Sequence, residues 1–169
     1  GIEVKVHPML IPNNHPLANV NDAFNAVFVH GKAMDDAMFM GRGAGQMPTA
    51  SAVVGDIIDV CRNIVHDSCG RIGCCCYKNL EVKDITDTKS KFFLRLEVAD
   101  KQGVLANIAS VLGNSGVSIA QVVQKSGKDG VAELVIITAE VLEKNFNDAM
   151  AVFKGLSAVK NIAGVIRVY

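Results

Sequence analysis

The 169-residue sequence has no excess of charge of either sign, because 17 lysines and arginines balance 17 aspartates and glutamates. This balance gives no support for binding to nucleic acid or to a membrane surface, since both require clustered positive charge. No apolar run approaches the length of a membrane-spanning helix. Charged and polar residues interrupt the first twenty positions, so we expect no signal peptide. These absences favour a cytoplasmic protein.

Cysteines are few, and their spacing is irregular. All five lie between Cys61 and Cys76, and three of them, Cys74–76, are consecutive. An odd number of cysteines with three neighbours argues against a disulfide framework. The gaps lack the paired C-x-x-C spacing of a zinc site, so even with His66 nearby we predict reduced thiols and no metal site. The role of the cysteine triplet stays open.

A glycine-rich turn is the most informative feature that the sequence does contain. Residues 41–53 read Gly-Arg-Gly-Ala-Gly-Gln-Met-Pro-Thr-Ala-Ser-Ala-Val. This order predicts a tight turn that leads into a helix, because glycine allows positive φ and Pro48 suits a first helical turn. The unpaired amides of that turn can receive a polar or anionic ligand. The spacing alone favours a simple packing turn, and it is not the dinucleotide fingerprint Gly-x-Gly-x-x-Gly.

The first half of the sequence contains three further patterns. Residues 2–7 alternate apolar and polar side chains, which predicts a half-buried strand, and the prolines that follow exclude regular structure. Residues 23–30 and 36–41 are typical of an antiparallel hairpin. After the glycine turn, helical spacing places eight residues on one apolar face: Ala50, Val53, Val54, Ile57, Ile58, Cys61, Ile64 and Val65.

The second half has a different organisation. Residues 67–90 break the helical pattern with glycines and a polar run, which predicts a linker. Residues 91–169 then contain strands at 92–98, 117–125, 131–138 and 164–169, with helices at 104–114 and 142–156. On the helices we expect a buried face formed by Leu105, Ile108, Ala109, Leu112, Leu142, Phe146, Ala149, Val152 and Phe153. The order βαββαβ predicts a ferredoxin-like sandwich with both helices on one face of an antiparallel sheet.

Four separate motifs carry a family resemblance for residues 1–66. They are Leu10-Ile11-Pro12, His15-Pro16-Leu17-Ala18, Asn25-Ala26-Val27 and residues 41–53, in this order. Together they closely resemble the end of the catalytic region of homoserine dehydrogenase. The resemblance implies an NAD(P)-dependent enzyme that interconverts aspartate semialdehyde and homoserine. It also implies that Gly45, with Gly43 and Ala44, lies against the nicotinamide cofactor.

The same resemblance places the family's catalytic lysine, its substrate-binding carboxylates and its Rossmann domain before Gly1. We therefore expect a fragment that starts within a longer protein, with a fold class of α+β. It would combine an incomplete α/β catalytic segment, residues 1–66, with a linker and a βαββαβ domain. We expect no catalytic residue in this chain, no tightly bound cofactor and no turnover by the chain alone.

Residues 91–169 resemble the ACT domain, a small-molecule sensor appended to enzymes of amino-acid metabolism. Asp100-Lys101-Gln102-Gly103-Val104-Leu105 matches its loop-to-helix signature, and Gly116-Val117-Ser118-Ile119 matches the entry to its second strand. Many members carry proline at the position of Gln102 and asparagine at that of Ser118. The resemblance implies an amino-acid effector, with threonine favoured, at a site formed by Asp100, Gln102, Gly103, Val104, Leu105 and the Ser118 of a partner chain.

Two alternative functions stay open, because a ferredoxin-like fold alone does not imply sensing. One is a stand-alone ACT-type module for amino-acid binding or dimerisation, which residues 41–53 disfavour. The other is a different ACT-bearing enzyme, such as a phosphoglycerate dehydrogenase, which residues 10–18 disfavour. In each case, sheet edges that pair side by side predict a homodimer or a larger homo-oligomer. The sequence leaves open the effector, the choice between NAD and NADP, and the oligomer size.

Overall fold

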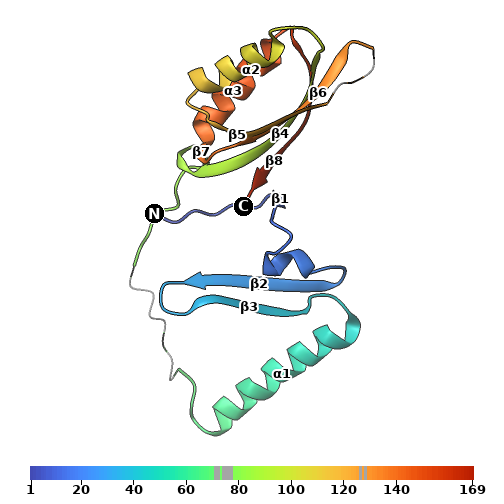
Figure 1. Cartoon of the computed structure of the whole chain (residues 1–169). Helices are drawn as coiled ribbons and strands as arrows, with labels where there is room; N and C mark the ends of the chain where they lie inside the picture. The colour runs from blue at the N-terminus through green and yellow to red at the C-terminus, as the bar shows by residue number, and fades with distance from the viewer. Residues whose placement is uncertain (71–72, 74–77, 126, 128) are drawn as a thin grey trace. The chain divides into compact units, whose positions relative to one another are not determined.

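The computed structural model describes residues 1–70, 73, 78–125, 127 and 129–169, which form two compact units (Figure 1). The sheet unit consists of Gly1–Leu10 together with Leu80–Tyr169, and the hairpin unit is Ile11–Asn79. Residues 1–10 thus group with the C-terminal part of the chain rather than with the segment that follows them. The domain limits at 1–66, 67–90 and 91–169 stay predictions.

A mostly antiparallel sheet forms the centre of the sheet unit. Its elements are β1 (Met9–Leu10), η2 (Ile85–Asp87), β4 (Lys89–Ala99), α2 (Val104–Asn114), β5 (Ile119–Lys125), β6 (Val131–Thr138), β7 (Val141–Leu142), α3 (Glu143–Gly155) and β8 (Val159–Val168). The strands lie in the order β1-β8-β4-β6-β5, and the short β7 pairs with the start of β4. Without the two-residue strands the order is βαββαβ, and both helices cover the same face (Figure 1). The predicted ferredoxin-like fold is confirmed.

The hydrophobic core lies between this face and the two helices. Along β6 every second residue is buried, from Ala132 to Thr138, because successive side chains of a strand point to opposite faces. The rings of Phe92 and Phe146 stack with their centroids 3.7 Å apart. The predicted helix positions that are buried in this core are Ile108, Leu112, Phe146, Ala149 and Phe153.

Three side chains that the helical pattern assigned to the core are exposed instead: Leu105, Leu142 and Val152. Leu142 precedes α3 as its N-cap residue, in extended conformation, so it lies outside the helical stripe. On α2 the neighbouring Val104 turns into the core, which directs Leu105 elsewhere. The last strand also begins at Val159 rather than at Gly164. The glycine lies inside β8, beside a register shift opposite Arg95 and Leu96, where its missing side chain tolerates the irregular pairing.

The predicted strand at residues 2–7 is wrong. Only Ile2 pairs there, through an isolated bridge to Val82, and the strand of this segment is β1, which pairs in parallel with the end of β8. Val4 and Val6 are exposed, whereas Lys5 is half-buried. Regular pairing at Met9 and Leu10 is possible after Pro8 because a proline removes only its own N–H donor.

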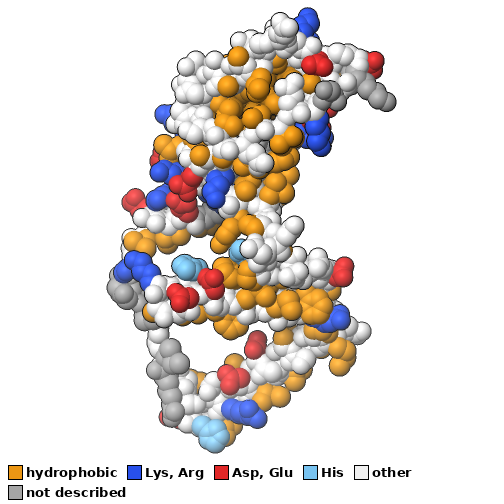
Figure 2. Space-filling view, viewed as in Figure 1, with side chains coloured by type: hydrophobic (Ala, Val, Ile, Leu, Met, Phe, Trp, Pro, Cys, Tyr) orange, Lys and Arg blue, Asp and Glu red, His pale blue; other side chains and the backbone are white. Residues whose placement is uncertain are grey.

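The hairpin unit contains η1 (Pro16–Asn19), the strands β2 (Phe24–Gly31) and β3 (Asp35–Arg42), and the helix α1 (Gln46–Val65). The two strands pair antiparallel in register from Phe24↔Arg42 to Gly31↔Asp35, which confirms the predicted hairpin and the helix after it. No residue of α1 is buried within the described chain. Figure 2 shows hydrophobic side chains at the surface over the hairpin and along α1.

Two of the five cysteines, Cys61 and Cys69, are exposed and free, while Cys74–76 lie outside the described residues. In the part of the chain that the structure describes, no three His, Cys, Asp or Glu side chains are grouped so that they could hold a metal ion. No described helix is both long and apolar enough to cross a membrane.

Candidate functional site

A pocket of about 310 Å³ lies where β4 ends and α2 begins. It is lined by the consecutive residues 98–105, by Gln124 of β5 and by Leu134 of β6. Gln124 and Leu134 are cross-strand partners in the β5–β6 register, so the sheet forms one wall and the loop forms the other. A pocket of this volume lies at the small end of the range for ligand sites.

Backbone hydrogen bonds hold the loop over this pocket. The Ala99 N–H donates to the Ala158 carbonyl at 2.9 Å, and the Asp100 N–H donates to the Gly130 carbonyl at 2.8 Å. Gly103 then adopts the left-handed conformation, with φ +83°, and caps α2. A Cβ at Gly103 would meet no atom within 4 Å, so this backbone conformation, rather than lack of space, requires glycine.

The start of α2, at the edge of the pocket, has amides without helical acceptors. Its first helical hydrogen bond runs from the Asn107 N–H to the Gly103 carbonyl at 3.0 Å. The preceding amides, those of Leu105 and Ala106, therefore belong to the helix start, where donors lack helical acceptors and the helix dipole is positive. Such a helix start stabilises a carboxylate.

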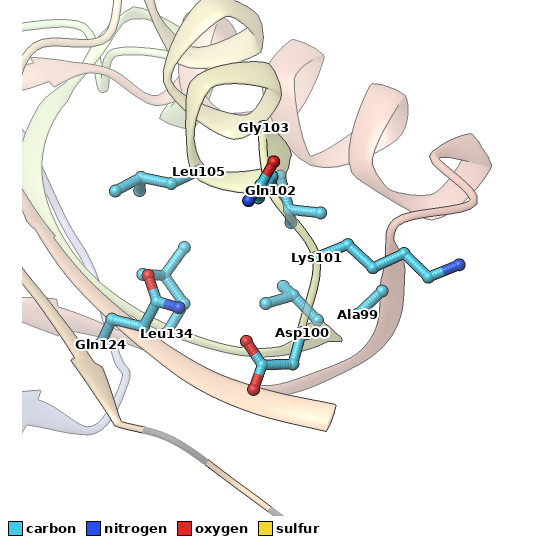
Figure 3. A pocket seen from close by; sticks show the side chains of 10 residues that line it. Ala99, Asp100, Lys101, Gln102, Gly103, Leu105, Gln124 and Leu134 are labelled. Carbon is cyan, nitrogen blue, oxygen red and sulfur yellow. The ribbon is translucent and has the colours of Figure 1, made fainter. Parts of the chain in front are cut away.

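Both polar and apolar side chains surround the open space of the pocket, here called the gap (Figure 3). Gln102 and Leu105 lie on one side of the gap and face Gln124 and Leu134 across it, while the Lys101 side chain extends away. The Asp100 carboxylate lies on the same side as Gln124. Leu105, 39% exposed, is thus a pocket residue rather than a core residue. The arrangement offers one carboxylate, two amides and two leucines to a small molecule.

Five of the six predicted effector residues line this pocket, namely Asp100, Gln102, Gly103, Val104 and Leu105. Ser118 does not: it is exposed beyond the far end of α2, and its carbonyl accepts a hydrogen bond from the Ala139 N–H at 2.8 Å. Its predicted contribution from a partner chain stays a prediction. Sequence reasoning missed Gln124 and Leu134, because finding them requires the register between β5 and β6.

The glycine turn adopts the conformation that its sequence predicts. Gly45 is the N-cap residue of α1 with φ +132°, a value that side chains disfavour. The Thr49 N–H donates to the Gly45 carbonyl at 3.1 Å, and Pro48 has no N–H. Of the amides in residues 46–49, only those of Gln46 and Met47 therefore precede the helical bonding pattern.

Gly43 lies close to the exposed side chain of Asn25. A Cβ at Gly43 would require the Asn25 side chain to move, and the Gly43 N–H donates to the Ala23 carbonyl at 3.0 Å. Residues 25–27 and 41–43 also line a common hollow of about 260 Å³ with Phe39. Two of the separate sequence motifs therefore form one surface in the fold. The turn is exposed, and the amides of Gln46 and Met47 at the helix start lack helical acceptors.

Comparison with known proteins assigns both parts of the chain. Residues 1–58 match the family model described as homoserine dehydrogenase, and residues 86–167 match an ACT domain model. Homoserine dehydrogenase of Corynebacterium glutamicum is 41% identical over 168 residues, which cover 99% of this chain and 37% of that protein. The enzyme of Pseudomonas aeruginosa is 37% identical over 175 residues, which cover 99% of this chain and 40% of that protein.

A solved structure agrees with these matches. The crystal structure of a homoserine dehydrogenase from Thiobacillus denitrificans superposes with a TM-score of 0.88 and 36% identity, covering 100% of this chain and 39% of that one. The chain thus spans about two fifths of the length of these relatives. The predicted resemblance is confirmed: the chain corresponds to the C-terminal part of homoserine dehydrogenases, in which the end of the catalytic region is followed by an ACT domain.

Proposed function

We propose that the chain is the regulatory part of an NAD(P)-dependent homoserine dehydrogenase of the cytoplasm, and that its ACT domain binds threonine as a feedback effector. The parent enzyme would interconvert aspartate semialdehyde and homoserine. The observation that carries the proposal is the pocket at the start of α2, where five predicted effector residues meet. The homoserine dehydrogenase match on residues 1–58 disfavours a stand-alone ACT module.

The chemistry of the pocket suits a small amino acid. The ligand's carboxylate would lie at the amides of Leu105 and Ala106, and its ammonium group would pair with Asp100. Its side chain would lie between Leu105 and Leu134, within hydrogen-bonding reach of the amides of Gln102 and Gln124. A threonine side chain has one methyl and one hydroxyl group, which matches a wall of leucines and amides.

In the hairpin unit, we propose that Gly43, Ala44 and Gly45 form one wall of the nicotinamide site in the parent enzyme. The cofactor itself supplies the hydride chemistry when it is bound. The residues of this chain would orient it, because the exposed turn lets another molecule approach the backbone closely. The resemblance implies that the family's catalytic lysine and substrate-binding carboxylates lie outside this chain, so we expect the chain alone to show no homoserine oxidation with either nicotinamide.

The sheet topology suggests which edge would form the homodimer. β8, at one side of the sheet, is partly covered by β1, whereas β5 at the other side has β6 as its single strand partner among the described residues. Pairing of β5 with the same strand of a second chain would satisfy its free backbone groups. Because Ser118 directly precedes β5 and Gln124 lies on it, this pairing would bring the partner's sheet edge to the effector pocket.

Calorimetric titration with threonine tests the proposal, with isoleucine and methionine as comparison ligands. We expect binding heat with the unchanged chain and a 10- to 100-fold weaker affinity for Asp100→Ala, since a hydrogen bond to a charged group contributes roughly 1.5–3 kcal/mol. Lys101→Ala is the matched control, because this neighbouring side chain extends away from the pocket. An intact dimer that gives no heat with any proteinogenic amino acid would favour a dimerisation module without a ligand.

A further inference from the structure

One carboxylate of the sheet unit is buried and fully paired. Glu143, at the first position of α3, is 2% exposed and is the only buried acidic residue among those described. Arg167 of β8 donates to both of its oxygens, from Nε at 2.6 Å and from Nη2 at 2.7 Å, and the Ser90 hydroxyl donates at 2.9 Å. This bidentate geometry is the strongest form of a charged hydrogen bond. Glu143 therefore holds β4, α3 and β8 together.

A second cation reaches the same carboxylate from the start of the chain. Lys5 Nζ lies 3.8 Å from Glu143 Oε1, and it donates to the Ser90 hydroxyl at 3.1 Å and to the Lys89 carbonyl at 3.2 Å. The Lys5 side chain is 15% exposed, whereas its neighbour Val6 is 100% exposed. In this segment the Lys5 side chain, rather than those of the two valines, thus contacts β4 and α3.

The charges around Lys5 alternate in sign. Lys5 Nζ also lies 3.9 Å from Glu3 Oε2. Lys83 Nζ lies 3.0 Å from the other oxygen of this carboxylate, Oε1. The order Arg167, Glu143, Lys5, Glu3, Lys83 therefore joins β8 and α3 to the first residues and to the segment before β4. Because each cation lies next to an anion, Lys5 adds no uncompensated positive charge beside Arg167.

Backbone pairing holds the same segment at both ends. Near its start, the Ile2 N–H donates to the Glu81 carbonyl at 2.8 Å, and the Lys83 N–H donates to the Ile2 carbonyl at 2.9 Å. At its end, β1 pairs with β8, and the Tyr169 N–H donates to the Leu10 carbonyl at 2.9 Å. Between these points, Lys5 makes the side-chain contacts with Glu143 and Ser90. The chain passes into the hairpin unit directly after Leu10.

We propose that residues 1–10 form a releasable strap on the ACT domain, and that Lys5 is the positioning residue that latches it to the Glu143–Arg167 pair. The buried residues of the ACT core all lie between Phe92 and Phe153, so none of them belongs to the strap. The strap is therefore an element whose docking can change while the ACT fold is kept. This inference does not depend on the identity of the effector.

Hydrogen–deuterium exchange on the full 169-residue chain tests the strap. Lys5→Met keeps most of the side chain's length but removes its charge and its donors. We expect amide exchange in residues 2–10 to rise about tenfold, the factor that about 1.4 kcal/mol of lost docking energy corresponds to. Exchange in α2 and β6 should stay as in the unchanged chain. Lys5→Arg, which retains a charged donor, should restore slow exchange.

Lys83→Met is the matched control. It removes a lysine of the same charge network whose contact with Glu3 is exposed, so we expect less than a threefold change in residues 2–10. The proposal is overturned if Lys5→Met leaves exchange in residues 2–10 unchanged, since backbone pairing alone would then hold the segment. It is equally overturned if α2 and β6 lose protection together with residues 2–10, because Lys5 would then support the whole fold rather than latch a strap.

Discussion

Replacement of Glu143 by glutamine isolates the charge of the buried carboxylate from its shape. Glu143→Gln keeps the size of the side chain, but it converts one acceptor oxygen into an NH₂ donor. The Nε and Nη2 donors of Arg167 lie 2.6 and 2.7 Å from the two carboxylate oxygens, so one of them must then face a donor. The guanidinium also loses its counter-charge, while the Ser90 hydroxyl can adapt by rotation.

The geometry sets the size of this effect. Removal of one partner from a buried ion pair costs about 3–5 kcal/mol, because the other charge stays buried without compensation. The Arg167 side chain is 25% exposed, and water can therefore solvate part of its charge. We accordingly expect a loss of about 2–3 kcal/mol in the unfolding free energy of the sheet unit. For a domain of this size, that loss lowers the melting temperature by roughly 10–20 °C.

Native-state hydrogen exchange of the most protected core amides, such as that of Leu94, measures this loss for the sheet unit alone. A single melting curve would mix the signals of two units. Glu133→Gln is the matched control: its carboxylate lies 3.8 Å from Arg95 in an exposed pair, which contributes about 0–1 kcal/mol. If the two glutamine variants lose the same stability, Glu143 is not the buried electrostatic centre of this domain.

Two further predictions concern pH and the glycine turn. Burial raises the pKa of Glu143, but the hydrogen bonds from Arg167 and Ser90 and the positive charges of Arg167 and Lys5 outweigh it, so the pKa is below its usual value. The stability that the ionised Glu143 contributes is then complete above its unfolded-state pKa, near 4.5, and is lost as the pH falls through its folded-state pKa. The urea midpoint, measured from pH 7 to 3, should therefore fall with pH. In Glu143→Gln this dependence of the midpoint on pH should become weaker. In the full-length enzyme, Gly45→Val should raise the KM for the nicotinamide cofactor. The valine adds a side chain to the proposed cofactor wall and strains a backbone at φ +132°. Unchanged kinetics would show that Gly45 is not part of that wall.

Much of the sheet unit could be predicted because local and long-range requirements agree there. The limits of α2 match the expected residues because glycine before Val104 and a small polar turn after Asn114 define them in the sequence. The strand expected at residues 131–138 likewise matches β6. The errors at Leu105 and Leu142 arose at helix ends, where a residue's direction depends on the cap geometry rather than on helical spacing.

The candidate pocket could be predicted only in part. The loop at residues 100–105 is continuous in the sequence, so a motif can identify it. Gln124 and Leu134 come from two strands, and they reach the loop only because β6 lies between β4 and β5. The sequence predicts the existence of these strands. Which residues lie opposite one another in β5 and β6 is set by packing of the whole sheet, which no local pattern contains.

The first ten residues show a second limit of periodicity. Alternation at positions 2–7 indicates two unlike faces, and the usual rule assigns the valines to the interior. In the fold it is Lys5 that turns inward, because Glu143 gives it a buried anion and Ser90 gives it an acceptor. The carboxylate that Lys5 contacts lies on α3, far along the sequence. The inward face of the segment is therefore decided by one ionised carboxylate rather than by the hydrophobic pattern of its own residues.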